Sequence, residues 1–157
     1  MAAITTAGVQ AMTSAQTQAL TTEQVAALTT GQVAALNTAN IRFLSVDHID
    51  ALDTAQVAAL TTAQATALTT QQLASFSTEQ TEAIETADLA ALSVAQVVSL
   101  GAGNAAALTT AQVVALTTAQ VAGLTTAQVA ALSSSQLGAM EVTDVRALTT
   151  AQDRKSV

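Results

Sequence analysis

The sequence predicts an all-α solenoid, a superhelix of short capped helices with one helix in each eight-residue repeat. Three observations lead to this prediction. Large apolar residues recur every eight residues without insertion or deletion, which is typical of a stack of repeats. Each repeat carries the signature of a helix start. An eight-residue period also cannot keep an apolar stripe on one long helix.

The repeat is clearest over residues 108–132, which read LTTAQVVALTTAQVAGLTTAQVAAL. If the eight positions are labelled a to h, with consensus LTTAQVAA, position a falls on every eighth residue from Ile4 to Leu148. All nineteen residues at position a are Leu, Ile, Met or Phe. We therefore predict one continuous array over residues 1–152, followed by a frayed tail at 153–157. The predicted structural core includes Leu20, Leu28, Leu36, Leu60, Leu108, Leu116, Leu124 and Leu132.

Positions b and e together form a capping signature. Position b is Thr, Ser, Asn, Asp or Gly in seventeen of nineteen copies, the exceptions being Glu85 and Glu141, and position e is Gln in thirteen. Thr-x-x-Gln is a capping box, in which each residue satisfies a backbone N–H near the other. The apolar residues at a and f have the spacing of a hydrophobic staple. The predicted caps in the most regular copies are Thr109, Gln112, Thr117, Gln120, Thr125 and Gln128.

Two other folds fit parts of the pattern. On a continuous helix, eight residues at about 100° each would rotate position a by roughly 80° per repeat, so the apolar residues would share no face. The paired Thr residues also disfavour a helix interior. A β-solenoid with one octad per face is the alternative; Thr and Val favour it, and the Ala of position h opposes it.

A longer period is also visible at position c. Val replaces Thr there only at Val46, Val94 and Val142, which lie 48 residues, or six octads, apart. If this spacing follows the superhelix, it predicts two, three or six octads in each turn.

Composition argues against several classes of function. The chain has no Cys and a single His, so acid–base and nucleophilic catalysis lack their usual groups and an enzyme is not expected. The net charge of −7 disfavours nucleic acid as a partner. There is no Trp or Tyr, and Phe43 and Phe76 are expected in the core. No cofactor is predicted.

The sequence also bears on membranes and export. No run of about twenty apolar residues occurs, so no membrane-spanning segment is expected. The first residues, MAAITTAGVQ, lack a basic region and a long apolar stretch, so no cleaved signal peptide is expected.

The most divergent copies, residues 37–53, contain the only candidates for a metal site. Asp47, His48 and Asp50 place an imidazole between two carboxylates, a set that can bind a divalent cation. However, His48 occupies position e, where it can replace the capping Gln, and this interpretation is preferred. Calcium binding is not expected at the two octads that combine Glu at b with Asp at e, because the spacing of a calcium loop is missing.

Residues 89–140 carry no charged side chain. Their surface is expected to be a coat of Thr, Ser, Gln and Ala, which offers little repulsion between copies.

The motif LTTAQVAAL, repeated across residues 4–152, resembles the octapeptide tracts of large secreted bacterial proteins of the haem-utilisation or adhesion type. The resemblance implies an extracellular or cell-surface location and a role in spacing, adhesion or assembly. It transfers no haem site to this chain.

We therefore predict a structural repeat protein, a rod or spacer whose uncharged Thr and Gln faces mediate self-association or adhesion. The alternative is a binding module that recognises a protein or polysaccharide through the divergent octads at 37–53 and 79–88. A minor alternative is an ice-binding array of regularly spaced Thr, although capping should consume the hydroxyl at position b.

Overall fold

The computed structural model describes residues 5–148, and every octad in that range forms one short helix. The predicted all-α solenoid is confirmed and the β-solenoid alternative is wrong, because no strand occurs among the described residues. The predicted tail at 153–157 lies outside them. In chain order the helices are α1 (Thr6–Gln10), α2 (Ser14–Gln18), α3 (Thr22–Ala26), α4 (Thr30–Ala35), α5 (Thr38–Ile41), α6 (Val46–Asp50), α7 (Thr54–Ala58), α8 (Thr62–Ala67), α9 (Thr70–Ala74), α10 (Thr78–Glu82), α11 (Thr86–Ala91), α12 (Val94–Ser99), α13 (Gly101–Ala107), α14 (Thr110–Ala115), α15 (Thr118–Gly123), α16 (Thr126–Ala131), α17 (Ser134–Ala139) and α18 (Val142–Ala147).

The corners of the solenoid lie at positions a and b. Leu116, between α14 and α15, has φ −61° and ψ 136°, an extended conformation that turns the chain before Thr117 caps the next helix. The corner between α12 and α13 is built differently. There Leu100 stays in the α-helical region and Gly101 takes φ +79°, a conformation that favours glycine.

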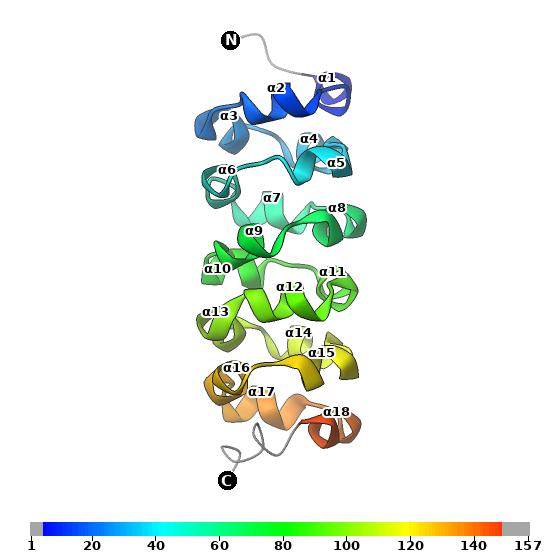
Figure 1. The fold of residues 1–157 in the computed structure, drawn as a ribbon, viewed down its shortest axis with the longest axis vertical. Coiled ribbons are helices and arrows are strands. Elements are labelled where there is room, and N and C mark those ends of the chain that lie inside the picture. Colours follow the sequence, from blue (N-terminus) through cyan, green and yellow to red (C-terminus); the bar gives the residue numbers. More distant parts are fainter. Residues whose placement is uncertain (1–4, 149–157) are drawn as a thin grey trace.

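The helices wind into a stack of turns around one axis (Figure 1). Each helix packs against the helix three octads away, as α8 does against α11 and α12 against α15. Hydrogen bonds join residues 28 to 31 positions apart in the same way, so one turn holds between three and four octads. The prediction of two, three or six octads based on the recurrence of Val at position c was partly wrong. Three octads per turn is near the packing offset, whereas two and six are not. The three Val residues also differ in environment, from half-buried Val46 to Val142, which is 66% exposed.

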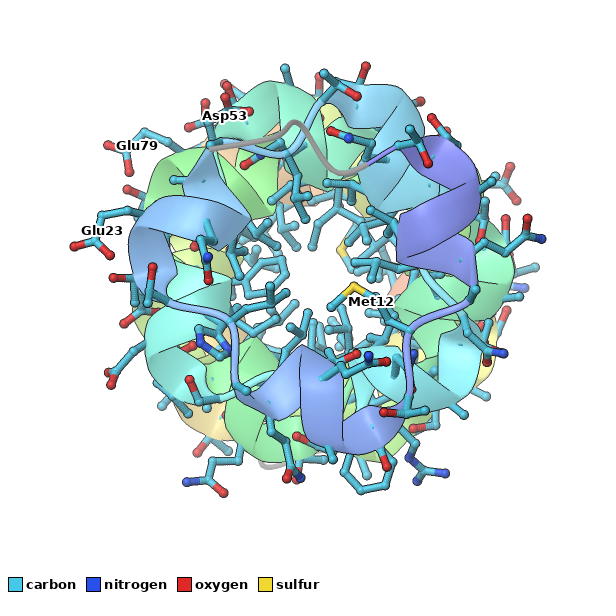
Figure 2. The ribbon with its side chains drawn as sticks, turned by 90° about the horizontal axis from the view of Figure 1, so that it is seen from above. Met12, Glu23, Asp53 and Glu79 are labelled. Carbon is cyan, nitrogen blue, oxygen red and sulfur yellow. The ribbon has the colours of Figure 1, made fainter. Side chains whose placement is uncertain are left out.

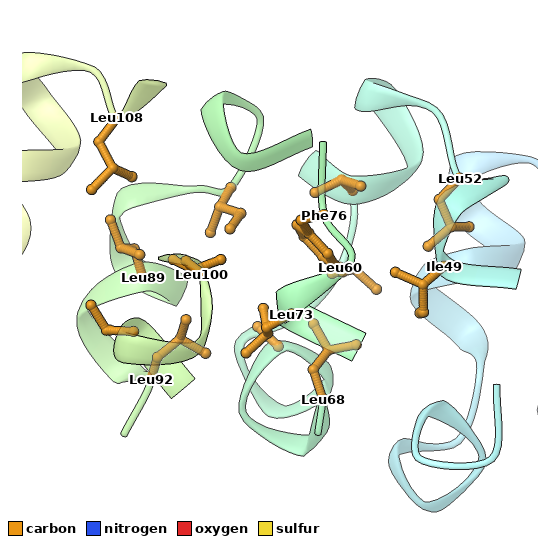
Figure 3. Close-up of a cluster of buried hydrophobic side chains, with 14 of the residues drawn as sticks. Ile49, Leu52, Leu60, Leu68, Leu73, Phe76, Leu89, Leu92, Leu100 and Leu108 are labelled. Carbon is orange, nitrogen blue, oxygen red and sulfur yellow. The ribbon is translucent and has the colours of Figure 1, made fainter. Parts of the chain in front are cut away.

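The core occupies the inside of the stack. Position-a and position-f side chains point inwards from successive helices (Figure 3). Leu20 is half-buried near the N-terminal end, and Phe43 at position h is 44% exposed, so its expected place in the core was wrong. Phe76 is buried, as expected. The other predicted core residues are all buried: Leu28, Leu36, Leu60, Leu108, Leu116, Leu124 and Leu132.

Among the described residues, no helix is long and apolar enough to cross a membrane.

Candidate functional site, a glutamine ladder between turns

The capping residues lie where the sequence places them. Thr117 N donates to Gln120 Oε1 at 2.7 Å, and Gln120 N donates to Thr117 Oγ1 at 3.3 Å. Thr109 with Gln112 and Thr125 with Gln128 form the same reciprocal box. Each of these octads therefore closes the N-terminus of its own helix, where four N–H groups would otherwise lack partners.

The same glutamines have a second role that the sequence reasoning missed. Gln120 Nε2 donates to Leu92 O at 2.7 Å and to Leu89 O at 2.9 Å, at the C-terminal end of α11. The side chain is 2% exposed. Its oxygen therefore caps the helix that carries it, while its nitrogen caps a helix of the preceding turn.

This arrangement recurs along the array, and we call the position-e side chains that bond to the preceding turn the glutamine ladder. The acceptors lie 28, 30 or 31 residues earlier, and they are helix C-terminal carbonyls, which otherwise lack partners. Within the described part of the chain, the glutamines that make such bonds include Gln56, Gln64, Gln72, Gln80, Gln96, Gln112, Gln120, Gln128 and Gln136. One feature of the sequence could have revealed the ladder. Glu serves a capping box as well as Gln does, yet Glu never occurs at position e.

The candidate metal residue His48 is a member of this ladder. Its Nδ1 accepts from Ser45 N at 3.3 Å, and its Nε2 lies 2.8 Å from Leu20 O, which corresponds to the tautomer protonated on Nε2. Both ring nitrogens are therefore engaged, while Asp47 and Asp50 are exposed. Within residues 5–148, no group of three or more metal-ligating side chains comes together.

Two asparagines replace glutamine in a similar way. Asn40 Nδ2 donates to Met12 O at 2.6 Å, and Asn104 Nδ2 donates to Phe76 O at 2.8 Å. These acceptors again lie 28 residues earlier, so the bond to the preceding turn survives a change of side chain.

Two aspartates reverse the polarity of the contact. Asp88 and Asp144 are 5% and 6% exposed, and each accepts a hydrogen bond from the hydroxyl of a Thr of the preceding turn. Thr62 Oγ1 donates to Asp88 Oδ1 at 2.6 Å, and Thr118 Oγ1 donates to Asp144 Oδ1 at 2.7 Å. The preceding residues at position b, Glu85 and Glu141, make no side-chain cap. The paired change at b and e thus replaces the capping box with a bond between turns.

Three acidic side chains lie on one side of the outer surface. Figure 2 shows Glu23, Asp53 and Glu79 projecting outwards together, which places them at similar angles around the axis. The pKa of Glu23 is lowered by a hydrogen bond from its own backbone N–H and by the hydroxyls of Thr21 and Thr22. The pKa of Glu79 is lowered in the same way, with Ser77 and Thr78 supplying the hydroxyls.

A different part of the outer surface is uncharged and partly apolar. A shallow depression on α11, α14 and α17 includes Val114, which is 45% exposed, together with Thr and Ala side chains. It lies almost entirely within the uncharged residues 89–140. The depression offers contact area without charge, and no chemically reactive group lines it.

The chain matches one family model, that of the ALTTAQ repeat, over residues 1–30, 27–62, 81–118 and 114–142. No curated protein and no solved structure matches it. The intervening residues 63–80 carry the same structural features, because Gln64, Gln72 and Gln80 all belong to the glutamine ladder.

Proposed function

Because the chain belongs to the ALTTAQ repeat family, we propose that it is a structural rod, a spacer at the cell surface or outside the cell that associates with its own kind. The glutamine ladder carries this proposal. The buried polar groups at position e join one turn to the next, which suits a chain with a structural role. The location is supported by the resemblance of the motif to the octapeptide tracts of secreted bacterial proteins.

The uncharged surface of residues 89–140 supports the self-association. The chain carries a net charge of −7, so most contacts between copies bring like charges together. Contacts through residues 89–140 avoid this repulsion. Exposed Val114 adds apolar area to the same surface.

Electron microscopy of the purified chain at high concentration, in physiological salt with and without calcium, tests the proposal. We expect ordered filaments or sheets. The double variant Ala119→Lys with Ala127→Lys, both at exposed position d, should suppress side-by-side association. Its matched control is Ala55→Lys with Ala63→Lys, which makes the same change at the same repeat position outside the uncharged surface.

Both double variants reduce the net negative charge equally, so a difference between them reports the surface and not the overall repulsion. Single short rods from the unmodified chain would contradict the proposal.

A second function is favoured by one observation. A groove lined in part by Arg42, Asp47 and Gln71 coincides with the divergent octads 37–53. It presents both charges and amides, as expected of a module that recognises a protein or polysaccharide partner. Discrete rods in the microscope would direct attention to this groove.

A further inference from the structure

The contact between successive turns has a direction. Position-e amides lie at helix N-termini and bond back to the preceding turn, while helix C-terminal carbonyls accept from the following turn. Apart from the reversed contacts of Asp88 and Asp144, each turn therefore has one edge that donates and one that accepts. The donating edge of one copy of the chain therefore complements the accepting edge of another copy when both have the same orientation.

At the beginning of the described array, the donating edge has a free group. Gln16 completes its capping box with Thr13, since Thr13 N donates to Gln16 Oε1 at 2.9 Å. Its Nε2 has no partner among residues 5–148, and the side chain is exposed, whereas Gln120 is buried. We define α1 to α4 as the N-terminal edge.

At the other end, the accepting edge also has free groups. The carbonyls of Leu132 and Met140 occupy the position that Leu92 fills for Gln120, and within the described part of the chain no position-e amide reaches them. We define α16 to α18 as the C-terminal edge.

The apolar side chains follow the same pattern. Met12 and Leu20 are half-buried at the N-terminal edge, and Leu137 and Leu148 are half-buried at the C-terminal edge. Figure 2 shows Met12 pointing towards the axis, in line with the buried side chains beyond it. Stacking one edge on the other would cover both pairs and extend the core.

We propose that a second copy of this chain docks head to tail, with its N-terminal edge on the C-terminal edge of the first. Gln16 Nε2 then donates to a helix C-terminal carbonyl of the other copy, as Gln120 donates to Leu92 within the chain. The inference rests on the proposed function, because it names the way in which the rods associate. The contact joins unlike surfaces and continues the same axis, so it produces filaments and not closed rings.

The test uses Gln16→Glu in the purified full chain. Glutamate keeps the capping box, so the fold is preserved, but it removes the donor and places a carboxylate against carbonyl oxygens. We expect end-to-end association to weaken by about tenfold or more in sedimentation velocity. Filaments in the microscope should shorten accordingly. The control is Gln18→Glu, which makes the same charge change at an exposed position of the same helix.

Mixing gives a sharper readout. A Gln16→Glu copy keeps its C-terminal edge, so it can dock at one end of a filament. Its altered N-terminal edge then binds the next copy only weakly. A small fraction of it added to the unmodified chain should therefore shorten filaments, whereas Gln18→Glu should not.

Filaments of equal length from the two variants would overturn head-to-tail docking while the self-association of the unmodified chain still stood. If the unmodified chain forms single rods only, both the docking and the proposed function fail. Circular dichroism of each variant verifies that the helices are intact.

Discussion

At the scale of single residues, position e explains the preference for an amide. Glutamine has an oxygen that accepts from its own helix and a nitrogen that donates to the preceding turn, as Gln120 does. His48 and Asn104 also donate a ring or amide N–H to the preceding turn. Asp88 cannot donate, and the bond between turns there comes from Thr62 instead.

Replacing Gln120 with Ala should cost more stability than replacing Gln16 with Ala. Both changes break a capping box, but only Gln120 also bonds to the preceding turn. We expect the free energy of unfolding to differ by about 1–3 kcal/mol, because carbonyls in the interior lose their donor. Urea denaturation of the two variants measures the difference. Equal losses would show that the ladder contributes nothing beyond capping.

At the scale of the helix, local sequence signals were sufficient to predict one short helix in each octad. Helices of four to seven residues are too short to persist alone, yet the starts of most of them are marked by a pair such as Thr117 with Gln120. The corner at Gly101 could not be predicted, because Leu100 remains helical there while its counterparts are extended. Neither residue type decides that conformation without the surrounding turns.

Acid should remove a small part of the stability through the helix-start carboxylates. The pKa of Glu23 and of Glu79 lies below the ordinary value of 4.5 in the folded chain, mainly because of each residue's own backbone N–H. A carboxyl group whose pKa is lower in the folded chain than in the unfolded chain stabilises the fold at pH values above its unfolded pKa. This stabilisation is lost as the pH falls through the folded pKa. We expect the urea midpoint to fall below pH 4.5.

The double variant Glu23→Gln with Glu79→Gln tests this origin. Its urea midpoint should fall less steeply with acid than that of the unmodified chain, while the two should have similar slopes near neutral pH. A variant with Glu82→Gln serves as a control, because Glu82 lies at the end of α10 and not at its start. Identical acid sensitivity in the unmodified chain and the double variant would contradict the prediction.

At the scale of the whole molecule, the sequence indicated a stack but left its winding open. The number of octads per turn depends on how α8 and α11 pack and on the reach of the side chain at position e. The sequence of a single repeat predicts neither the helix packing nor the reach of that side chain. The Val residues at position c suggested a period, but they share no common packing: Val94 lies against Gly123 of the following turn, whereas Val142 is 66% exposed. For the same reason, the cap role of Gln120 was predictable while its bond to Leu92 was missed.

Deleting a whole octad should be tolerated, and deleting half of one should not. Removal of residues 109–116 shifts Gln120 onto the carbonyl of Ile84, another position-a residue, so the ladder is restored. We expect native-like helicity and cooperative unfolding. Removal of residues 109–112 brings polar positions into the core and should lower helicity and stability sharply. Circular dichroism with thermal denaturation distinguishes the two, and equal behaviour would contradict the register.

The offset of 28 residues in the glutamine ladder equals three and a half octads, so successive turns are staggered by half a repeat. This stagger between turns has a mechanical consequence. A helix that makes this bond contacts both helices that flank a corner of the preceding turn, as α15 packs on α12 and bonds to Leu92 at the end of α11. A pulling force on such a helix is divided between two neighbours, so the described turns resist splitting along the axis.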